Sequence, residues 1–190
     1  ATVTVTGGAN GITLGTGVVN ITGGTGIETI SIDNGDLDAA DTIAGAGAND
    51  ILSTVGAVTL ADAAFTNVTT VEAITAAANG AQTFVLGSLA EAAGINTVTG
   101  GGGNDSINAS GYSTRIDIDV AAGNDTVIGG SAGDDFTSGN GGINSFRGQG
   151  GADTITGGNG SDILVLEATG ALNGTDVFTD FVVAQSDTLN

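Results

Sequence analysis

The chain has no cysteine, histidine, proline, methionine or tryptophan, and only two of its 190 residues are basic. Without cysteine it can form neither disulfides nor thiolate metal sites, and without histidine it lacks the commonest general base and zinc ligand. Carboxylates are therefore the main candidates for any chemistry. No apolar run approaches the ~18 residues of a membrane-spanning helix. Because the chain starts at Ala1 rather than Met, we expect it to be processed or to be a piece of a longer protein.

Positively charged residues are also nearly absent. Twenty-one Asp and Glu face only Arg115 and Arg147, giving a net charge of −19. This balance argues against nucleic acid and against membrane insertion or binding to an anionic membrane, and it predicts bound cations. An acidic chain can simply be disordered, but runs of Val, Ile and Thr argue for strands instead.

Aromatic residues are scarce, whereas glycine is abundant. The chain has 35 Gly but only six Phe and one Tyr. Its hydrophobic fraction of 40% consists mostly of Ala, Val and Ile. A thin core of small residues favours a solenoid over an ordinary globular domain.

A nine-residue repeat organises most of the sequence. Its clearest copy, GGNGSDILV at residues 157–165, has a glycine-rich turn, an Asp at position six and an apolar residue at position eight. The units are 5–13, 14–22, 23–31, 36–44, 45–53, 100–108, 120–128, 129–137, 139–147, 148–156 and 157–165. Their eighth positions are Ile12, Ile21, Ile30, Ile43, Leu52, Ile107, Val127, Phe136, Phe146, Ile155 and Leu164. We therefore predict an all-β fold, a parallel β-solenoid or β-roll in which each unit forms a turn and a short strand.

The sixth position indicates where metal binds. It is occupied by Asn10, Val19, Glu28, Asp41, Asp50, Asp105, Asp125, Asp134, Asn144, Asp153 and Asp162. Because the first units lack Asp, we expect residues 1–53 to form degenerate coils held mainly by apolar stacking. Residues 100–165 are expected to form the metal-dependent roll.

The remaining segments break the nine-residue step. Residues 54–99 are predicted to form wider coils or a lateral insertion, with strands at 68–75 and 82–86. A short helix is expected at 88–93, with Ser88 as N-cap, Glu91 at the capping-box position and Gly94 as its stop.

Two further segments show strand patterns without the turn motif. In residues 109–119, Ile116 and Ile118 alternate with Asp117 and Asp119, which predicts one buried and one exposed face. Val165 and Leu166 predict a strand covered on both faces, and Phe178 and Phe181 are expected to anchor a cap over 166–190.

Calcium is the ion that such turns suit. Ca²⁺ takes about six to eight oxygen ligands, and one turn with inward carbonyls and an Asp supplies about half of them. With two units per coil, turns 18 residues apart stack, so Asp105, Asp125, Asn144 and Asp162 share one side, and Asp134 and Asp153 the other. This arrangement predicts about four sites or more, whereas Asp41 and Asp50 need other partners. The candidate ligands are Asp41, Asp50, Gly100, Gly102, Asn104, Asp105, Ala122, Asn124, Asp125, Gly130, Gly133, Asp134, Gly141, Asn144, Gly148, Gly150, Asp153, Gly157, Asn159 and Asp162.

Four stretches resemble the repeats-in-toxin (RTX) calcium-binding proteins: GGGGNDSI at 100–107, GGSAGDDF at 129–136, GQGGADTI at 148–155 and residues 157–165. The resemblance implies a right-handed β-roll, type I secretion and folding in extracellular calcium. Residues 61–112 resemble bacterial β-strand-repeat surface and S-layer proteins. Asn144, the spacer Ser138 and Ala132 depart from the RTX pattern.

These features favour a calcium-dependent extracellular structural protein of an S-layer, surface fibre or matrix, which self-associates into a lattice or filament. A cell-surface polysaccharide is a further candidate partner. The alternative is a calcium-binding secretion or adhesion module of a larger exoprotein. An enzyme is not expected, since the adjacent acids Asp117 and Asp119 are those of a solvated strand face.

Overall fold

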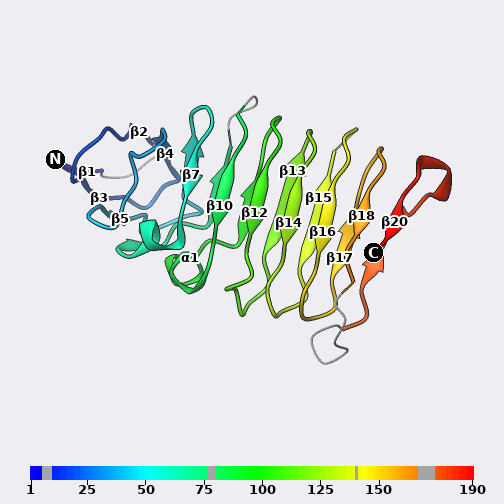
Figure 1. The fold of residues 1–190 in the computed structure, drawn as a ribbon. Helices are drawn as coiled ribbons and strands as arrows, with labels where there is room; N and C mark the ends of the chain where they lie inside the picture. The colour runs from blue at the N-terminus through cyan, green and yellow to red at the C-terminus, as the bar shows by residue number, and fades with distance from the viewer. Residues whose placement is uncertain (6–9, 77–79, 140, 167–173) are drawn as a thin grey trace.

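The computed structural model describes residues 1–5, 10–76, 80–139, 141–166 and 174–190. Within these residues, short parallel strands stack into a solenoid of about eight turns, as Figure 1 shows from the blue N-terminus to the red C-terminus. Residues one coil apart in sequence therefore lie side by side. The predicted parallel β-solenoid is confirmed.

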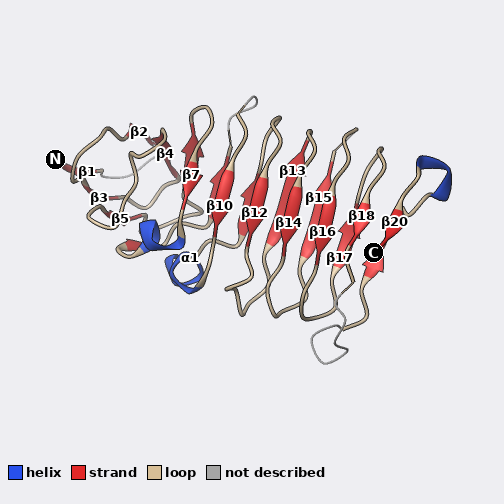
Figure 2. Cartoon of the chain, in the orientation of Figure 1, coloured by secondary structure: helices blue, strands red, loops and turns tan. Residues whose placement is uncertain are grey.

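The described strands form three parallel sheets, with turns and loops between them (Figure 2). The nine-stranded sheet contains β2 (Asn10–Thr13), β4 (Glu28–Ile32), β6 (Ile51–Thr54), β9 (Ala73–Thr75), β11 (Thr97–Thr99), β13 (Asp117–Ala121), β15 (Asp135–Ser138), β17 (Thr154–Thr156) and β19 (Val177–Phe178). The seven-stranded sheet contains β7 (Thr59–Leu60), β10 (Thr83–Val85), β12 (Ser106–Asn108), β14 (Thr126–Ile128), β16 (Ser145–Arg147), β18 (Ile163–Leu164) and β20 (Thr188–Leu189). The four-stranded sheet contains β1 (Thr2–Thr4), β3 (Asn20–Thr22), β5 (Thr42–Ala44) and β8 (Val68–Thr69). The helical pieces are η1 (Asp62–Phe65), α1 (Ser88–Ala93) and η2 (Val183–Gln185).

The apolar eighth position of the repeat builds the core. Ten of its eleven residues are buried, and the remaining one, Ile12, is partly buried and packs against the same core. The rings of Phe136 and Phe146 stack inside the solenoid with their centroids 6.4 Å apart. Successive residues of a strand point to opposite faces, so most of the short strands between β3 and β18 contribute one or two side chains to the interior, whereas β1 and β20 are exposed.

Coil length varies along the solenoid. Paired residues of the nine-stranded sheet are 18 positions apart at Ile118 and Phe136, but 24 apart at Ile74 and Val98. The 18-residue spacing predicted for two nonapeptides per coil thus occurs at Ile118 and Phe136, and the coil that joins Ile74 to Val98 is wider. Insertions are absorbed in the turns, because the strands must stay in register to keep their hydrogen bonds.

Residues 54–99 contribute coils to the solenoid. The strand predicted over 68–75 is wrong, since β8 and β9 belong to different sheets and are separated by a corner at Thr70, where φ is 52°. The predicted helix is present as α1, and Gly94 ends it in the left-handed conformation with φ 109°.

The predicted cap of α1 is also wrong. Its N-cap is Gly87 without a side-chain cap of its own, and Ser88 is the first helical residue. Asp62 of the preceding coil accepts hydrogen bonds from the backbone N–H groups of Gly87 (2.8 Å), Leu89 (3.3 Å) and Ala90 (2.9 Å). Glu91 instead accepts a hydrogen bond from Ser113 Oγ at 2.9 Å, in the next coil.

The C-terminal segment adds another coil. Strands β19 and β20 pair in parallel with β17 and β18, and Phe178 packs against the core. Phe181 meets the edge of Phe178 but is 37% exposed, and Leu166 is 48% exposed. The expectation that Leu166 is covered is therefore wrong, because the chain continues the solenoid in register.

Candidate metal centre

The sixth positions of the repeats form two columns that run along the solenoid. In the first column, beside the seven-stranded sheet, the N–H of Asp105 donates to Asp125 Oδ1 (2.8 Å), that of Asp125 to Asn144 Oδ1 (2.9 Å) and that of Asn144 to Asp162 Oδ1 (3.0 Å). In the second column, the N–H of Asp134 donates to Asp153 Oδ1 at 2.8 Å. The predicted neighbours are thus brought together, each side chain reaching back to the preceding coil.

Both columns extend beyond the residues predicted from the repeat. Gln82 precedes Asp105, donating its N–H to Asp105 Oδ1 at 2.7 Å. Asp187 follows Asp162, and Asp176 follows Asp153, each accepting the N–H of the preceding member. Sequence reasoning missed these three because their segments lack the glycine-rich turn. A Gly174-Thr175-Asp176 fragment was the one usable signal.

The second oxygen of most column carboxylates has no hydrogen-bond donor. Among the described residues, the buried Oδ2 atoms of Asp105, Asp125, Asp153 and Asp162 have no partner. Asp134 differs, since its Oδ2 accepts the N–H of Gly130 at 2.7 Å. Burying a carboxylate oxygen without a hydrogen-bond donor costs free energy, and a bound cation beside these four atoms would offset that cost.

In four of the turns, the first glycine leaves room for the Oδ2 atom of the Asp. A Cβ on Gly100, Gly148 or Gly157 would collide with Oδ2 of the Asp five residues later. A Cβ on Gly129 would meet both Asp134 Oδ2 and the carbonyl oxygen of Gly148 in the next coil. At each of these glycines a carboxylate oxygen therefore lies against a bare Cα, joined at Gly129 by a carbonyl oxygen, and a side chain there would have to displace it.

Burial dominates the electrostatics of the columns. It raises the pKa of Asp105 from 3.8 to about 6, against a lowering by the hydrogen bond from Gln82, and the charge of Asp125 adds to the rise. It likewise raises the pKa of Asp153 to about 6, with the charges of Asp176 and Asp134 contributing. The pKa values of Asp125, Asp134 and Asp162 are raised as well, mainly by burial. Burial thus disfavours the charged carboxylates unless a positive charge joins them.

The donor set fits calcium. No three acidic side chains converge on one point among the described residues, so any ion must combine one or two carboxylates with backbone carbonyls and water. Hard oxygen donors without nitrogen or sulfur are what Ca²⁺ prefers. Asp105, Asp125, Asp153 and Asp162, with turn carbonyls, would hold it, and the ion would supply the missing positive charge.

Asn144 has a different environment. Its Oδ1 continues the ladder, whereas its Nδ2 donates to Ser138 Oγ at 2.8 Å. Both polar atoms of the Asn144 amide are therefore hydrogen-bonded without an ion, and the acceptor of its Nδ2, the spacer Ser138, is buried.

The other predicted ligands lie in the same glycine-rich turns as these Asp residues. Residue 140 and residues 6–9, in the turn of unit 5–13, lie outside the described residues. Asn104 and Asn124 form an exposed ladder, in which Asn104 Oδ1 accepts the N–H of Asn124 at 2.9 Å and Asn124 Oδ1 that of Ile143 at 2.7 Å. Asn159 Oδ1 accepts a hydrogen bond from Gln185 Nε2 at 3.3 Å. Gly102, Ala122, Gly130, Gly133, Gly141 and Gly150 would offer only carbonyl oxygens, so their roles as ligands stay predictions.

Asp41 and Asp50 lie in two different columns of the N-terminal half. Asp41 accepts the N–H groups of Val19 (2.8 Å) and Asp38 (2.9 Å), one on each oxygen. Asp50 lies beside the nine-stranded sheet, where its Oδ1 accepts the N–H of Glu28 at 2.6 Å. Neither has an Asp of another repeat in the adjacent coil.

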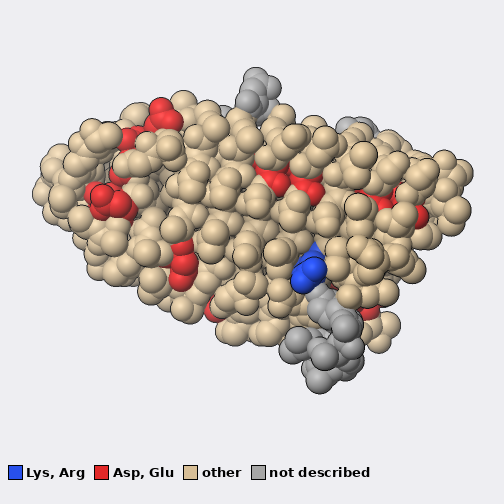
Figure 3. Space-filling model, in the orientation of Figure 1, with Lys and Arg blue, Asp and Glu red and all other residues tan. Residues whose placement is uncertain are grey.

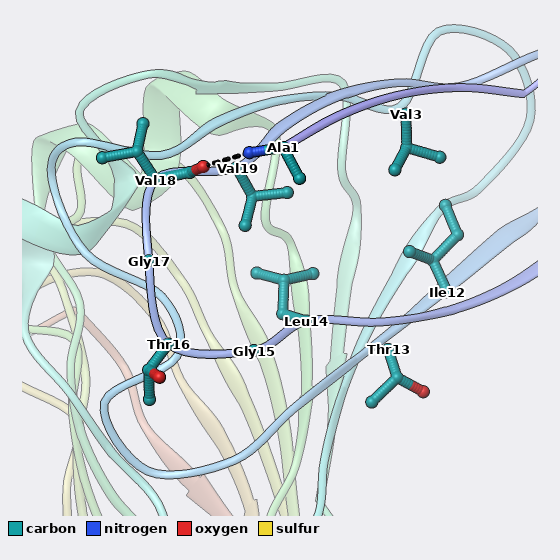
Figure 4. Close-up of a pocket in the computed structure, with 10 residues that line it drawn as sticks. All are labelled: Ala1, Val3, Ile12, Thr13, Leu14, Gly15, Thr16, Gly17, Val18 and Val19. Atoms are coloured by element: carbon teal, nitrogen blue, oxygen red, sulfur yellow. Dashed lines mark hydrogen bonds between the residues drawn. The ribbon is translucent and has the colours of Figure 1, made fainter.

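The surface offers little beside these columns. A cavity of about 450 Å³ near the N-terminus is lined by Val3, Ile12, Leu14, Val19 and neighbouring residues, without a carboxylate (Figure 4). On the outer face of the nine-stranded sheet, Arg115 pairs with Asp117 (2.7 Å) and Asp135 (3.2 Å). Acidic atoms are dispersed over the visible face, which shows a single basic patch (Figure 3).

Comparison with known proteins agrees with the columns. The family model of the RTX calcium-binding nonapeptide repeat matches four copies, at residues 92–111 and 138–168. No curated protein sequence and no solved structure matches the chain significantly. In the described part of the chain, none of the helices has the length and hydrophobicity needed to cross a bilayer. The units at 120–137 fall between the matched ranges, and their turns continue the same columns.

Proposed function

Because the chain carries RTX calcium-binding nonapeptide repeats in a parallel β-solenoid, we propose that it is a calcium-dependent extracellular structural protein. Calcium bound between stacked turns folds and stiffens the roll. The observation that carries this proposal is the row of buried Oδ2 atoms without donors on Asp105, Asp125, Asp153 and Asp162. Four such atoms support about four sites.

Net charge explains why the ion would control folding. At −19, with only two basic residues, the chain repels itself, and its core is thin. Each bound Ca²⁺ cancels two charges and gives donor-free oxygens a partner. Since the unfolded chain does not hold these oxygens together, the binding free energy becomes folding free energy.

A structural role outside the cell suits this dependence. RTX repeats are typical of secreted proteins, which meet about millimolar calcium outside the cell. The RTX β-roll is a calcium-binding scaffold and not a known enzyme fold. We propose secretion by a type I system and assembly into an S-layer, fibre or matrix. Apolar side chains exposed on the last coil, at Val177 (49%), Val183 (76%) and Leu189 (59%), support self-association.

The alternative function is a calcium-binding module for secretion or adhesion within a larger exoprotein. It is favoured by the confinement of the recognised repeats to residues 92–168. Electron microscopy in calcium separates the two functions. Ordered sheets or filaments support the structural protein, whereas monomers at high concentration support the module.

Calcium dependence itself is tested by circular dichroism and calorimetry on the full chain. We expect the β signal and the melting temperature to fall when calcium is removed, and titration to count about four ions. Asp125→Asn should remove one ion, while Asp119→Asn, an exposed acid on the outer face, should remove none. An unchanged melting temperature without calcium, or a count of zero, would refute the proposal.

A further inference from the structure

An acidic column in the N-terminal half lies outside the residues that match the repeat model, beside the same nine-stranded sheet as Asp134 and Asp153. It links Glu28, the first residue of β4, with Asp50 and Glu72, which directly precede β6 and β9 of the nine-stranded sheet. The N–H of Glu28 donates to Asp50 Oδ1 at 2.6 Å, and the N–H of Asp50 donates to Glu72 Oε2 at 2.7 Å. Glutamate thus continues the ladder in the two coils that flank Asp50.

Asp50 is the member of this column that has a buried oxygen without a donor. Its side chain is fully buried, and its Oδ2 has no hydrogen-bond partner among the described residues. Glu28 is different, because its Oε1 accepts from Asn10 Nδ2 (3.4 Å) and its Oε2 from the N–H of Gly24 (3.2 Å). The oxygen that lacks a partner, Asp50 Oδ2, therefore lies between the coil of Asp50 and the next coil.

The next coil presents a carbonyl at the same place. A Cβ on Gly45 would collide with both Asp50 Oδ2 and the carbonyl oxygen of Thr70. Thr70 has φ 52°, which is rare for a β-branched residue, and its hydroxyl accepts the N–H of Ala46 at 2.8 Å. Asp50 Oδ2 and the carbonyl oxygen of Thr70 therefore both lie against the Cα of Gly45, and both are hydrogen-bond acceptors.

The N-terminal half of the chain has no basic side chain to neutralise these acids. The first 99 residues contain nine Asp and Glu but no Lys or Arg. Burial is the main cause of the raised pKa of Asp50, and the negative charges of Glu28 and Glu72 raise this pKa further. Positive charge at this point must come from solution.

We propose that the turns at 45–50 and 70–72 bind one hard divalent cation of the Ca²⁺ type. Asp50 Oδ2, the carbonyl oxygen of Thr70 and the carboxylate of Glu72 are its protein ligands, and water completes the shell. The site uses Glu and a β-branched residue where the nonapeptide turn uses Asp and Gly. It rests on the proposed calcium dependence and extends it into the N-terminal coils.

The test is Asp50→Asn in the full chain, titrated with Ca²⁺ alone and counted by native mass spectrometry. The Asn Oδ1 still accepts the N–H of Glu28, while its Nδ2 can donate to the Thr70 carbonyl, much as Asn144 donates to Ser138. We expect one ion fewer than in the wild type, together with a higher melting temperature in the absence of calcium. Asp119→Asn, with the same loss of charge, should change neither value.

Glu72→Gln provides a second, independent variant, since Gln can still accept the N–H of Asp50. It should also lose one ion. An unchanged ion count in both variants, with calcium bound by the wild type, would overturn this site and leave the C-terminal sites standing. A wild type that binds no calcium would overturn the proposed function and this site together.

Discussion

Without calcium, the fold should lose stability as the pH rises from about 5 to 7.5. Burial raises the pKa values of Asp105 and Asp153 from 3.8 to about 6 in the folded protein. Between these values the folded state holds protons that the unfolded state has released. The stabilisation is therefore fully present below pH 3.8 and is lost as the pH rises through about 6.

The size of the effect follows from linkage. A carboxyl group whose pKa moves from 3.8 to about 6 on folding contributes about 1.4 kcal/mol more at pH 5 than at pH 7.5, so the two together contribute about 3 kcal/mol. Asp50, Asp125, Asp134 and Asp162 have raised pKa values and act in the same direction. Since domains are stable by only about 5–15 kcal/mol, this loss is a large fraction.

Urea unfolding followed by circular dichroism measures this change directly. The free energy of unfolding is compared at the two pH values in calcium-depleted buffer and again in calcium. Calcium needs ionised carboxylates, so the loaded protein should show the opposite trend and be more stable at the higher pH. Asp105→Asn should remove about 1.4 kcal/mol of the calcium-free difference between the two pH values, and Asp119→Asn none. Calcium-free stability that is constant or rises with pH would refute the burial argument.

Two further substitutions test the turns and the helix. Gly148→Ala places a methyl group against the carboxylate of Asp153 and should destabilise the loaded protein by about 1–3 kcal/mol in urea unfolding. Gly15→Ala, where a Cβ meets nothing within 4 Å, is the matched control. Equal losses of stability in the two variants would contradict the close contact between Gly148 and the carboxylate of Asp153. Asp62→Ala removes the acceptor at the start of α1 and should cost about 1–2 kcal/mol. Its calcium count should not change, and a lower count by calorimetry would mean that α1 takes part in binding.

The repeat itself was sufficient to predict the core and the main columns. Position eight carries apolar residues such as Ile30 and Phe146 in every unit, and a period fixed by one turn and one strand brings them all inside. The same period places Asp134 beside Asp153. These features are local, because each unit carries its own turn and strand.

Contacts between coils of unequal length could not be predicted from the repeat. Asp50 meets Glu28 and Glu72, each 22 residues away, because inserted residues lengthen these coils while strand pairing keeps them in register. Asp62 caps α1 across a coil boundary for the same reason. Asp187 joins the first column without a glycine turn to mark it.

The sequence alone thus determined the kind of fold and the residues of its interior, and it predicted that the Asp-bearing turns bind calcium. The tertiary structure decided which oxygens lie together without a donor, as at Asp50 and Asp125 but not at Asp41. The physical reason is that a turn is encoded within nine residues. The environment of a carboxylate depends instead on the coil stacked against it, and the intervening insertions set which coil that is.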